Sequence, residues 1–473
     1  MKKASITLYL CLILSVLLSL IAVSFYSARI AAGRAILACS LEEGMFSLFG
    51  EYDSKLFARY GLMFLDGGRG DSSLRLHKLT DRTEEYASYI VNPGRDTGGK
   101  VPVSMSVPAA SITGYVLATD GGGEAFRRQV CTAMKGRLAG NAARKVLRLS
   151  QETQTLAETQ RSELQKNQND DSVTESEQAA ADVIDLGPDY SDPRDSVAAA
   201  RRMGIMNLVI PAGRTVSAGT VDLADLPSGR SLQRGIGGIA VSKRGLADHA
   251  LLMEYAVEMF HSFTSADAAE QGGLQYQLEY LICQKGSDAE NLKGTLNRLM
   301  LMREASNLAF LTANPAKRAE SLAAATAVTG LFGAPYLAPL VAAGIRTAWA
   351  FAEGVFDLRR LLNGEKVSLV KTEENWQLSI SQLPTFLNSS GSGTEEDSDG
   401  LDYEGYLRLL LLIKSDTDLT KGLMDLVEDT MRHTDGENNF RIDNCIDAMA
   451  MELTVTAEGK ELKTYEQYGY GMN

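Results

Sequence analysis

The sequence predicts a mainly helical α+β protein, in which an N-terminal transmembrane helix extends into a long helix and a two-part ectodomain with small antiparallel sheets follows. An uncharged apolar run covers residues 4–28. Apolar residues recur at helical spacing in several later segments, and the segments 101–107 and 449–455 alternate apolar and polar residues as strands do. These observations, in a chain with 45% hydrophobic and 23% charged residues, indicate a globular protein held by an anchor.

The uncharged run at Ala4–Ala28 is about 25 residues long, slightly more than the roughly 20 that a helix needs to cross a bilayer. Its apolar residues lie all round the helix, which argues against a buried helix of a soluble protein. A secretory signal cut near Ala22-Val23-Ser24 is the other alternative, but such signals have apolar stretches of about 7–15 residues. We therefore predict an uncleaved anchor over residues 1–28, with the lipid bilayer as partner.

Charge and cysteine content indicate the orientation in the membrane, the partners that are excluded and the state of the thiols. Lys2 and Lys3 favour a cytoplasmic N-terminus, which puts the bulk of the single-pass protein outside the cell membrane. The net charge of −13 argues against nucleic acid as a partner, since phosphate binding needs basic clusters. The five cysteines are few and widely spaced, so free thiols are preferred to a Cys283–Cys445 bridge.

The helix is expected to continue past the membrane as a helical extension over residues 29–65. Apolar residues follow a 7-4-7-4 spacing that keeps them on one stripe, and they are Ile30, Leu37, Leu41, Leu48 and Tyr52. Gly61, after Arg59-Tyr60, is typical of a C-terminal cap. A single helix from Ser5 to Tyr60 is the result.

Residues 66–165 are predicted to form a small β unit followed by a long polar helix. The loop Asp66–Asp71 precedes a strand over 101–107, a partner strand over 111–119 and a helix over 124–165. Residues 166–195 are rich in small polar and acidic side chains and low in large apolar ones, which predicts a flexible linker.

Residues 196–388 are predicted to form a helical α+β domain. Its expected elements are strands and turns over 207–230, a helix over 245–263, a strand over 275–283 and a helix over 288–311. The run Ser321–Ile345 is also uncharged, so a second membrane span is possible by length. Its glycines, prolines and many alanines favour two short buried helices, broken near 334–339.

The end of the chain is predicted to be a linker over 389–400, then C-terminal helices and a β-hairpin over 401–473 that pack on the preceding domain. The segment 401–413 is strongly apolar and helical, and Met449–Val455 alternates as a strand. Glu458-Gly459 can turn that strand back toward Leu462–Tyr470.

Candidate chemistry is sparse, and we predict no catalytic, cofactor-binding or metal-ligating residues. The segment Gly94–Val101 (GRDTGGKV) nearly matches a phosphate-binding loop but has Val101 where Ser or Thr should hold magnesium. Arg69-Gly70-Asp71, the tripeptide that some adhesins present, is interpreted as an ordinary turn. His77, His249, His261 and His433 are scattered and form no zinc motif.

Glu353 and Asp357 are one helical turn apart and share a face, so they are the pair to which acid–base chemistry could be assigned. Arg346, Arg359 and Arg360 lie nearby in the sequence. On a helix with such neighbours, ion pairing is the preferred interpretation.

The opening residues Lys2–Leu8 (KKASITL), followed by the apolar helix, resemble the TadE/TadG-like pseudopilins of tight-adherence pili. In those proteins a prepilin peptidase cuts after a small residue, and the resemblance places this cut after Ala4, with Ser5 beginning the mature chain. Pilins carry glutamate at the fifth mature position, where this chain has Tyr9. The resemblance therefore implies a pilin-like helix rather than a pilin.

A second resemblance covers most of the chain and implies a location but no reaction. The residues that carry it are Ser47–Asp53, Arg59–Leu62, Glu279–Ile282, Trp349 through Glu353 to Asp357, and Leu361–Val367. Together they resemble an uncharacterised family of Gram-positive envelope proteins, a domain of unknown function whose members tend to accompany tight-adherence pilus genes.

The two resemblances and the anchor predict a membrane-anchored, extracytoplasmic accessory component, pseudopilin-like, of a tight-adherence pilus or related secretion or envelope assembly. Pilus or secretion-system proteins would be its partners, and no enzymatic activity or cofactor is expected. The alternative is a surface enzyme or ligand-binding receptor that uses a cleft between subdomains.

Overall fold

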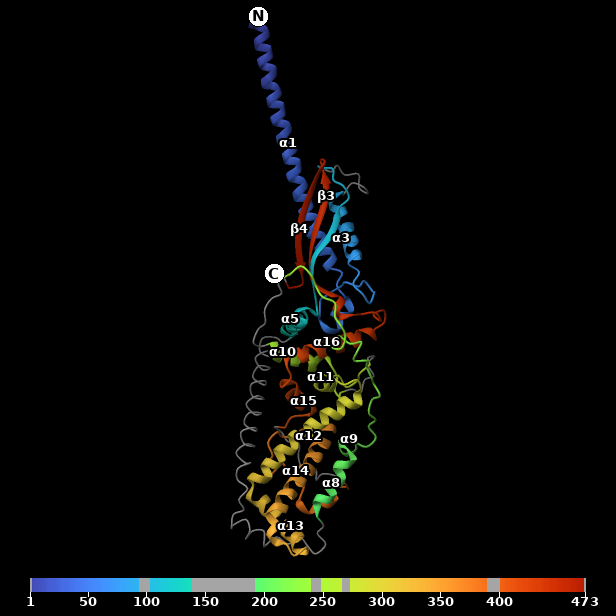
Figure 1. Cartoon of the computed structure of the whole chain (residues 1–473), viewed down its shortest axis with the longest axis vertical. Helices are drawn as coiled ribbons and strands as arrows, with labels where there is room; N and C mark the ends of the chain where they lie inside the picture. The colour runs from blue at the N-terminus through green and yellow to red at the C-terminus, as the bar shows by residue number, and fades with distance from the viewer. Residues whose placement is uncertain are drawn as a thin grey trace. The chain divides into compact units, whose positions relative to one another are not determined.

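The computed structural model describes residues 2–92, 103–137, 192–239, 248–265, 273–388 and 400–471. They form two compact units, each built from separate stretches of chain: Met1–Ala133, Leu226–Gly245 and Thr430–Asn473 make the first, and Met134–Asp225 with Leu246–Asp429 the second. Helices dominate, and one small antiparallel sheet accompanies them (Figure 1). The predicted mainly helical α+β class is confirmed.

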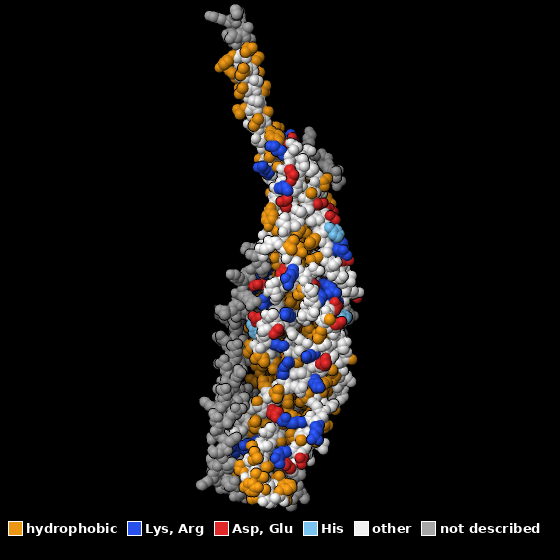
Figure 2. Space-filling model, in the orientation of Figure 1, with side chains coloured by type: hydrophobic (Ala, Val, Ile, Leu, Met, Phe, Trp, Pro, Cys, Tyr) orange, Lys and Arg blue, Asp and Glu red, His pale blue; other side chains and the backbone are white. Residues whose placement is uncertain are grey.

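Helix α1 (Lys2–Phe49) is the first element of the first unit, and its two halves differ. The large apolar side chains from Leu8 to Phe25 are 44–70% exposed, and Figure 2 shows them along the outer part of the helix. Within the described residues, α1 is the one helix long and apolar enough to cross a membrane. From Ile30 onward, one stripe of α1 is buried in the core.

The predicted continuous helix to Tyr60 is wrong, because α1 ends at Phe49. The chain turns at Gly50 and Glu51, and Tyr52 forms a β-bridge with Leu65. Asp53 then caps a separate helix, α2 (Ser54–Tyr60), by accepting hydrogen bonds from the amides of Lys55 and Leu56. The predicted cap at Gly61 is confirmed by its left-handed φ of 69°.

The sheet is organised around β3 (Cys445–Ala457), which pairs antiparallel with every other strand: β1 (Leu65–Asp66), β2 (Ala109–Leu117) and β4 (Lys460–Gly469). The predicted hairpin is confirmed: Ala457 pairs with Lys460 across a two-residue turn. Glu458 and Gly459 both have positive φ, 51° and 74°, as the tightest hairpin turns require.

The predicted strand over 101–107 is wrong in its described residues, 103–107, and the strand partner of β2 is β3. Met105 makes only an isolated bridge, to Ala457. Prolines at 102 and 108 flank this segment and cannot donate ladder hydrogen bonds, which explains why its alternation does not yield a strand.

The core of the first unit lies between the sheet, the inner half of α1 and α3 (Leu76–Val91). Helix α5 (Asp120–Arg137) follows β2, and Gly121–Gly123 at its start have left-handed backbone angles. It is the described part of the predicted polar helix over 124–165, since residues 138–191 lie outside the described residues. Asp192 caps α8 (Pro193–Met203), so the last residues of the predicted linker 166–195 are helical.

The regular elements of the second unit are all helices in its described residues, and turns, irregular segments and isolated β-bridges connect them. Besides α8 and part of α5, its helices are α9 (Ile205–Val209), α10 (Asp248–Met259), α11 (Gln277–Cys283), α12 (Asp288–Ala313), α13 (Pro315–Leu331), η1 (Pro335–Leu337), α14 (Ala338–Leu362), η2 (Ile380–Asn388), α15 (Tyr403–Leu412) and most of α16 (Asp416–Arg432). A further 3₁₀ turn, η3 (Ile442–Asn444), precedes β3 in the first unit.

Two strand predictions in the second unit are wrong. The segment 275–283 contains helix α11, in which residues 277–282 are all buried, so its short alternation did not mark a sheet face. Residues 207–230 begin with the end of α9 and continue as turns, with one isolated bridge between Thr220 and Ser287. Short apolar runs do not distinguish a buried helix from a strand by periodicity alone.

The uncharged run Ser321–Ile345 is divided between α13 and α14, as predicted, by a turn at Phe332–Ala334 and by η1. The helices are longer than predicted, 17 and 25 residues. The predicted burial is wrong at the break itself, where Leu331, Phe332 and Tyr336 are 78–81% exposed.

The C-terminal segment 401–473 is shared between the two units: α15 and most of α16 belong to the second, and residues from Thr430 onward to the first. Most of the predicted linker 389–400 lies outside the described residues.

We expect Leu41→Ala, in the buried stripe of α1, to lower the stability of the first unit by about 2–5 kcal/mol, because it opens a cavity in the core. Hydrogen exchange of the β3 amides, read by mass spectrometry on the full chain, measures the loss. Glu42→Ala, next door and exposed, is the control and should change little. Equal protection in the two variants would contradict the packing described.

Candidate functional site

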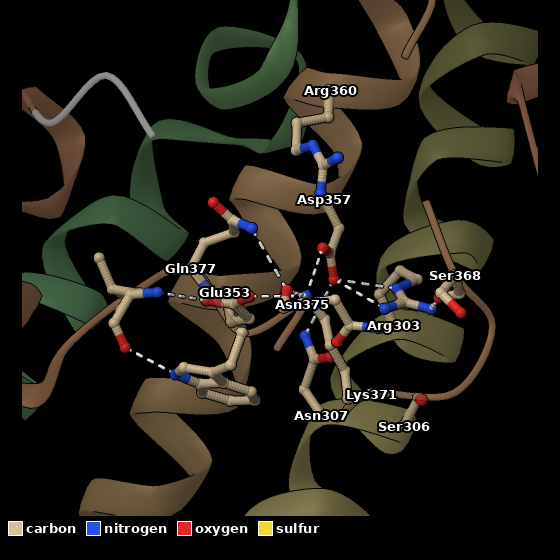
Figure 3. A network of polar contacts seen from close by, with 12 residues as sticks. Arg303, Ser306, Asn307, Glu353, Asp357, Arg360, Ser368, Lys371, Asn375 and Gln377 are labelled. Atoms are coloured by element: carbon tan, nitrogen blue, oxygen red, sulfur yellow. Dashed lines mark hydrogen bonds and ion pairs between the residues drawn. The ribbon is translucent and has the colours of Figure 1, made fainter. Parts of the chain in front are cut away.

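Four charged side chains are enclosed among the helices of the second unit. Arg303 comes from α12, Glu353 and Asp357 from α14, and Lys371 from the segment that follows α14. Their side chains are at most 1% exposed. Figure 3 shows them pointing toward one another, so they form the charge network of this unit.

The local sequence explains why these helices meet so closely. Helix α14 is buried on all sides from Ala348 to Leu358, which leaves its two acidic residues no route to solvent. Gly354 lies between them and faces α12: a Cβ atom there would come within 2.9 Å of Met300 Cε. The glycine therefore allows the approach that brings Arg303 to Asp357.

Asp357 is the centre of the network. Its Oδ2 accepts hydrogen bonds from Arg303 Nε at 3.0 Å and Asn307 Nδ2 at 3.3 Å, and its Oδ1 accepts one from Lys371 Nζ at 2.8 Å. Arg303 also donates through Nη1 to the hydroxyl of Tyr406 and the carbonyl of Ser368. Asp357 thus links α12 with the segment after α14.

Glu353 holds the same segment one helical turn earlier. Its Oε1 accepts from Lys371 Nζ at 2.6 Å, and its two oxygens accept the amides of Gln377 and Leu378 at 3.0 and 2.9 Å. The carbonyl of Leu378 in turn accepts the indole N–H of Trp349. Glu353 therefore fixes both the side chain of Lys371 and the backbone at Gln377 and Leu378.

The electrostatics of the two carboxyl groups differ. Burial alone would raise the pKa of Asp357, but the charges of Arg303 and Lys371 outweigh it and hold the pKa below the usual value. Burial raises the pKa of Glu353, and Lys371 offsets this only in part because Asp357 opposes it. With two cations and two carboxylates, the network balances charge inside the core.

The predicted ion pairing of Glu353 and Asp357 is confirmed, but the expected partners are wrong. Arg360 pairs with Glu365, and Arg359 donates to the carbonyl of Leu208. Arg346 donates to the hydroxyl of Ser321. The actual cations, Arg303 and Lys371, come from elsewhere in the sequence, which no local spacing indicates. Since no group of the network reaches solvent, the pair offers a substrate no access in this conformation.

A second buried carboxyl group, Glu279, lies in α11 and is 0% exposed. Its Oε1 accepts hydrogen bonds from the amide of Phe263 at 2.9 Å and the hydroxyl of Tyr403 at 2.8 Å, whereas Oε2 has no hydrogen-bond partner among the residues that the structure describes. Burial raises the pKa of Glu279 to about 7, against the lowering effect of these two donors. The alternating pattern predicts a strand here and gives Glu279 no role. The one indication in the sequence is a single acidic residue within an apolar stretch.

The remaining candidates from the sequence form no site. Arg69-Gly70-Asp71 lies in a turn, as predicted, with Arg69 paired to Glu51 and Asp71 to Arg75 and Lys78. The GRDTGGKV segment lies outside the described residues. The described part of the chain contains no cluster of three or more His, Cys, Asp or Glu able to hold a metal ion.

The five cysteines are free thiols, so the Cys283–Cys445 alternative does not occur in this structure. Ala4 and Ser5 lie in the first turns of α1, and their side chains are outside the described residues.

The fold and the network define a mainly helical α+β protein with an apolar N-terminal helix and a closed, charge-balanced core. Residues 186–457, more than half of the chain, match the family of unknown function DUF5702, and the chain belongs to this family. The match includes Glu279 and the whole charge network. No curated protein and no solved structure matches the chain.

We expect Lys371→Met to lower the free energy of unfolding by about 3–5 kcal/mol, because it leaves Glu353 buried without its cation. Urea unfolding followed by tryptophan fluorescence measures this, since Trp349 and Trp376 lie beside the network. Adding Glu353→Gln should recover part of the loss.

Glu365→Gln is the control for the Lys371 variant, because it breaks the more exposed Arg360–Glu365 pair and should cost less than about 1 kcal/mol. Equal losses for Lys371→Met and Glu365→Gln would show that the buried network does not stabilise the second unit.

We expect Glu279 to make stability depend on pH. Its folded pKa of about 7 lies above the unfolded value of 4.5, so its contribution is complete below pH 4.5 and is lost as pH rises through 7. The total loss is roughly 3 kcal/mol, at about 1.4 kcal/mol per pKa unit. Urea unfolding at several pH values measures the free energy of unfolding of the native chain and of Glu279→Gln, which lacks the titrating carboxyl group.

Tyr403→Phe is the matched control for this titration. It keeps the carboxyl group but removes a donor that lowers the pKa, so the loss of stability should move to higher pH. A native chain whose profile runs parallel to that of Glu279→Gln between pH 4.5 and 7 would contradict the assignment.

Proposed function

We propose that this chain is a membrane-anchored, extracytoplasmic, pseudopilin-like component of an envelope assembly, with a tight-adherence pilus as the specific candidate. The observation that carries the proposal is the division of α1 into an apolar outer half with exposed side chains and an inner half packed into its own domain. Such a helix can place the outer half in a bilayer while the inner half fixes the domain to it.

The contacts where the outer half of α1 meets the inner half support a membrane–water interface at this point of the helix. Arg29 pairs with Glu458 of the β3–β4 turn at 2.7 Å, and the ammonium of Lys460 lies 5.3 Å from the ring centroid of Tyr26. Basic and aromatic side chains of this kind are favoured where hydrocarbon gives way to headgroups. The proposal therefore puts the membrane surface near Tyr26 and the hairpin turn beside it.

Membership of an uncharacterised family supports no reaction, so the assembly role rests on the sequence and on α1. The KKASITL opening supports a pilin-like helix, and Tyr9 in place of glutamate supports an accessory part rather than a fibre subunit. A structural role also agrees with the enclosed state of Glu353 and Asp357.

The native cysteines test orientation and assembly together. Cys11 lies in the proposed span, Cys39 is exposed on the inner half of α1, and Cys131 and Cys445 are buried. We expect a membrane-impermeant maleimide to label Cys39 but not Cys11 on intact cells, read by mass spectrometry of peptides. Labelling of Cys39 should be stronger in cells without the pilus genes, because partners then leave α1 uncovered.

Cys39→Ser is the control and should remove the signal. Labelling of Cys39 only after lysis would overturn the proposed orientation. Equal labelling with and without the pilus genes would leave the anchor in place but reject the pilus role.

A further inference from the structure

The helical hairpin of α13, η1 and α14 carries an exposed apolar tip. Leu331, Phe332 and Tyr336 are 78–81% exposed, Leu340 is 73% exposed and Leu337 is 40% exposed. Figure 2 shows hydrophobic side chains gathered at this end of α13, at the lower edge of the view. We call these five residues the hairpin tip.

Charge is absent from the tip and from both helix ends that support it. Between Glu320 and Arg346 the chain contains no Asp, Glu, Lys, Arg or His. The five side chains come from the end of α13, the turn, η1 and the start of α14, so every segment of the tip contributes exposed apolar surface. A lipid layer can take up such an uncharged apolar end.

Several polar groups of the turn find their hydrogen-bond partners within the hairpin. The turn amides of Phe332, Gly333, Ala334 and Leu337 donate to carbonyls of Thr329, Gly330 and Ala334. Pro335 and Pro339 have no amide hydrogen to satisfy. The hydroxyl groups of Thr326 and Thr329 donate back to α13. Hydrocarbon requires this internal satisfaction, while contact with water does not.

The size of the tip also argues against a second copy of the chain as its partner. Five side chains of this kind expose roughly 500 Å², less than the about 800 Å² per partner of a stable protein interface. Lipid insertion has no such threshold, because each apolar side chain contributes on its own. We propose that the hairpin tip inserts into one leaflet of a phospholipid bilayer, as a membrane contact separate from α1.

The insertion is shallow by the dimensions of the hairpin. After the buried stretch Ser321–Ala325, Ala327 is the first exposed residue of α13, and from there to Phe332 the chain rises about 8 Å. This matches the roughly 5–10 Å to which interfacial segments enter the boundary of headgroups and chains, and it is far less than the about 30 Å of a full span. The tip is thus a leaflet contact and not a second transmembrane segment.

The test uses the full chain in phosphatidylcholine–phosphatidylglycerol proteoliposomes, with Phe332→Trp as the tip reporter and the spectrum of the unsubstituted chain subtracted. Brominated lipid is placed either in the bilayer that holds α1 or in added protein-free vesicles. We expect a blue-shifted emission and bromine quenching of the tip reporter in at least one arm. Adding Leu340→Ser should reduce the ratio of inserted to free tip by roughly tenfold, the effect of one apolar side chain.

Leu301→Trp is the matched control, because Leu301 is 68% exposed on α12 of the same unit but stands outside the tip. It should be neither shifted nor quenched. Quenching that is equal for the tip reporter and the control, or absent for the tip reporter in both arms, overturns the proposal. A blue shift of the tip reporter without lipid, rising with protein concentration in detergent, also overturns it by assigning the tip to a second copy. The maleimide experiment on Cys39 reads α1 independently of either result.

Discussion

The first unit depends on β3, a strand that reaches its partners only from the far end of the chain. β1 and β2 precede it by more than 300 residues, and β4 follows directly across a two-residue turn. The face that packs on α1 and α3 includes Met449, Met451, Leu453 and Val455. Because burial of apolar area dominates folding stability, α1 is held to its domain by contacts that form only after most of the chain is made. The sheet of the first unit therefore joins strands that lie far apart in the sequence.

The second unit solves a similar problem with charge. Helix α14 is so thoroughly buried that its two carboxyl groups must find cations inside the core. A buried carboxylate is tolerated when it is paired and hydrogen-bonded, and it is costly when it is not. Asp357 meets this condition with Arg303, Lys371 and Asn307, whereas Glu279 meets it in part and is better buried protonated. The same physical cost gives one residue a fixed charge and the other a pH-dependent one.

The sequence predicted what local patterns determine and missed what long-range pairing determines. The stripe of α1, the cap at Gly61, helix α12 and the β3–β4 hairpin each depend on residues within a few turns of one another, and the structure confirms them. The stop at Phe49 was missed because the stripe continues to Tyr52, while Asp53 offers the backbone a competing cap.

At the site, the spacing of Glu353 and Asp357 predicted a shared face and ion pairing. Helical spacing does not predict the cations that pair with them, because Arg303 lies 54 residues before Asp357 and Lys371 lies in an irregular segment. The strand assigned to 275–283 failed for a related reason. Alternation reports one buried face only when the other face is wet, and in α11 both are covered.

The two uncharged runs show how composition divides segments of equal length. The run Ala4–Ala28 contains seven leucines and neither glycine nor proline, so nothing interrupts its helix. The run Ser321–Ile345 has eight alanines, three glycines and two prolines. Gly333, at φ 64°, makes the turn, and Pro335 and Pro339 begin the next helical segments. Alanine supports close helix packing but little lipid affinity, so the apolar character of this run is concentrated where the chain turns. The second run therefore forms a helical hairpin with an apolar tip, whereas the uninterrupted leucine-rich run forms one continuous helix.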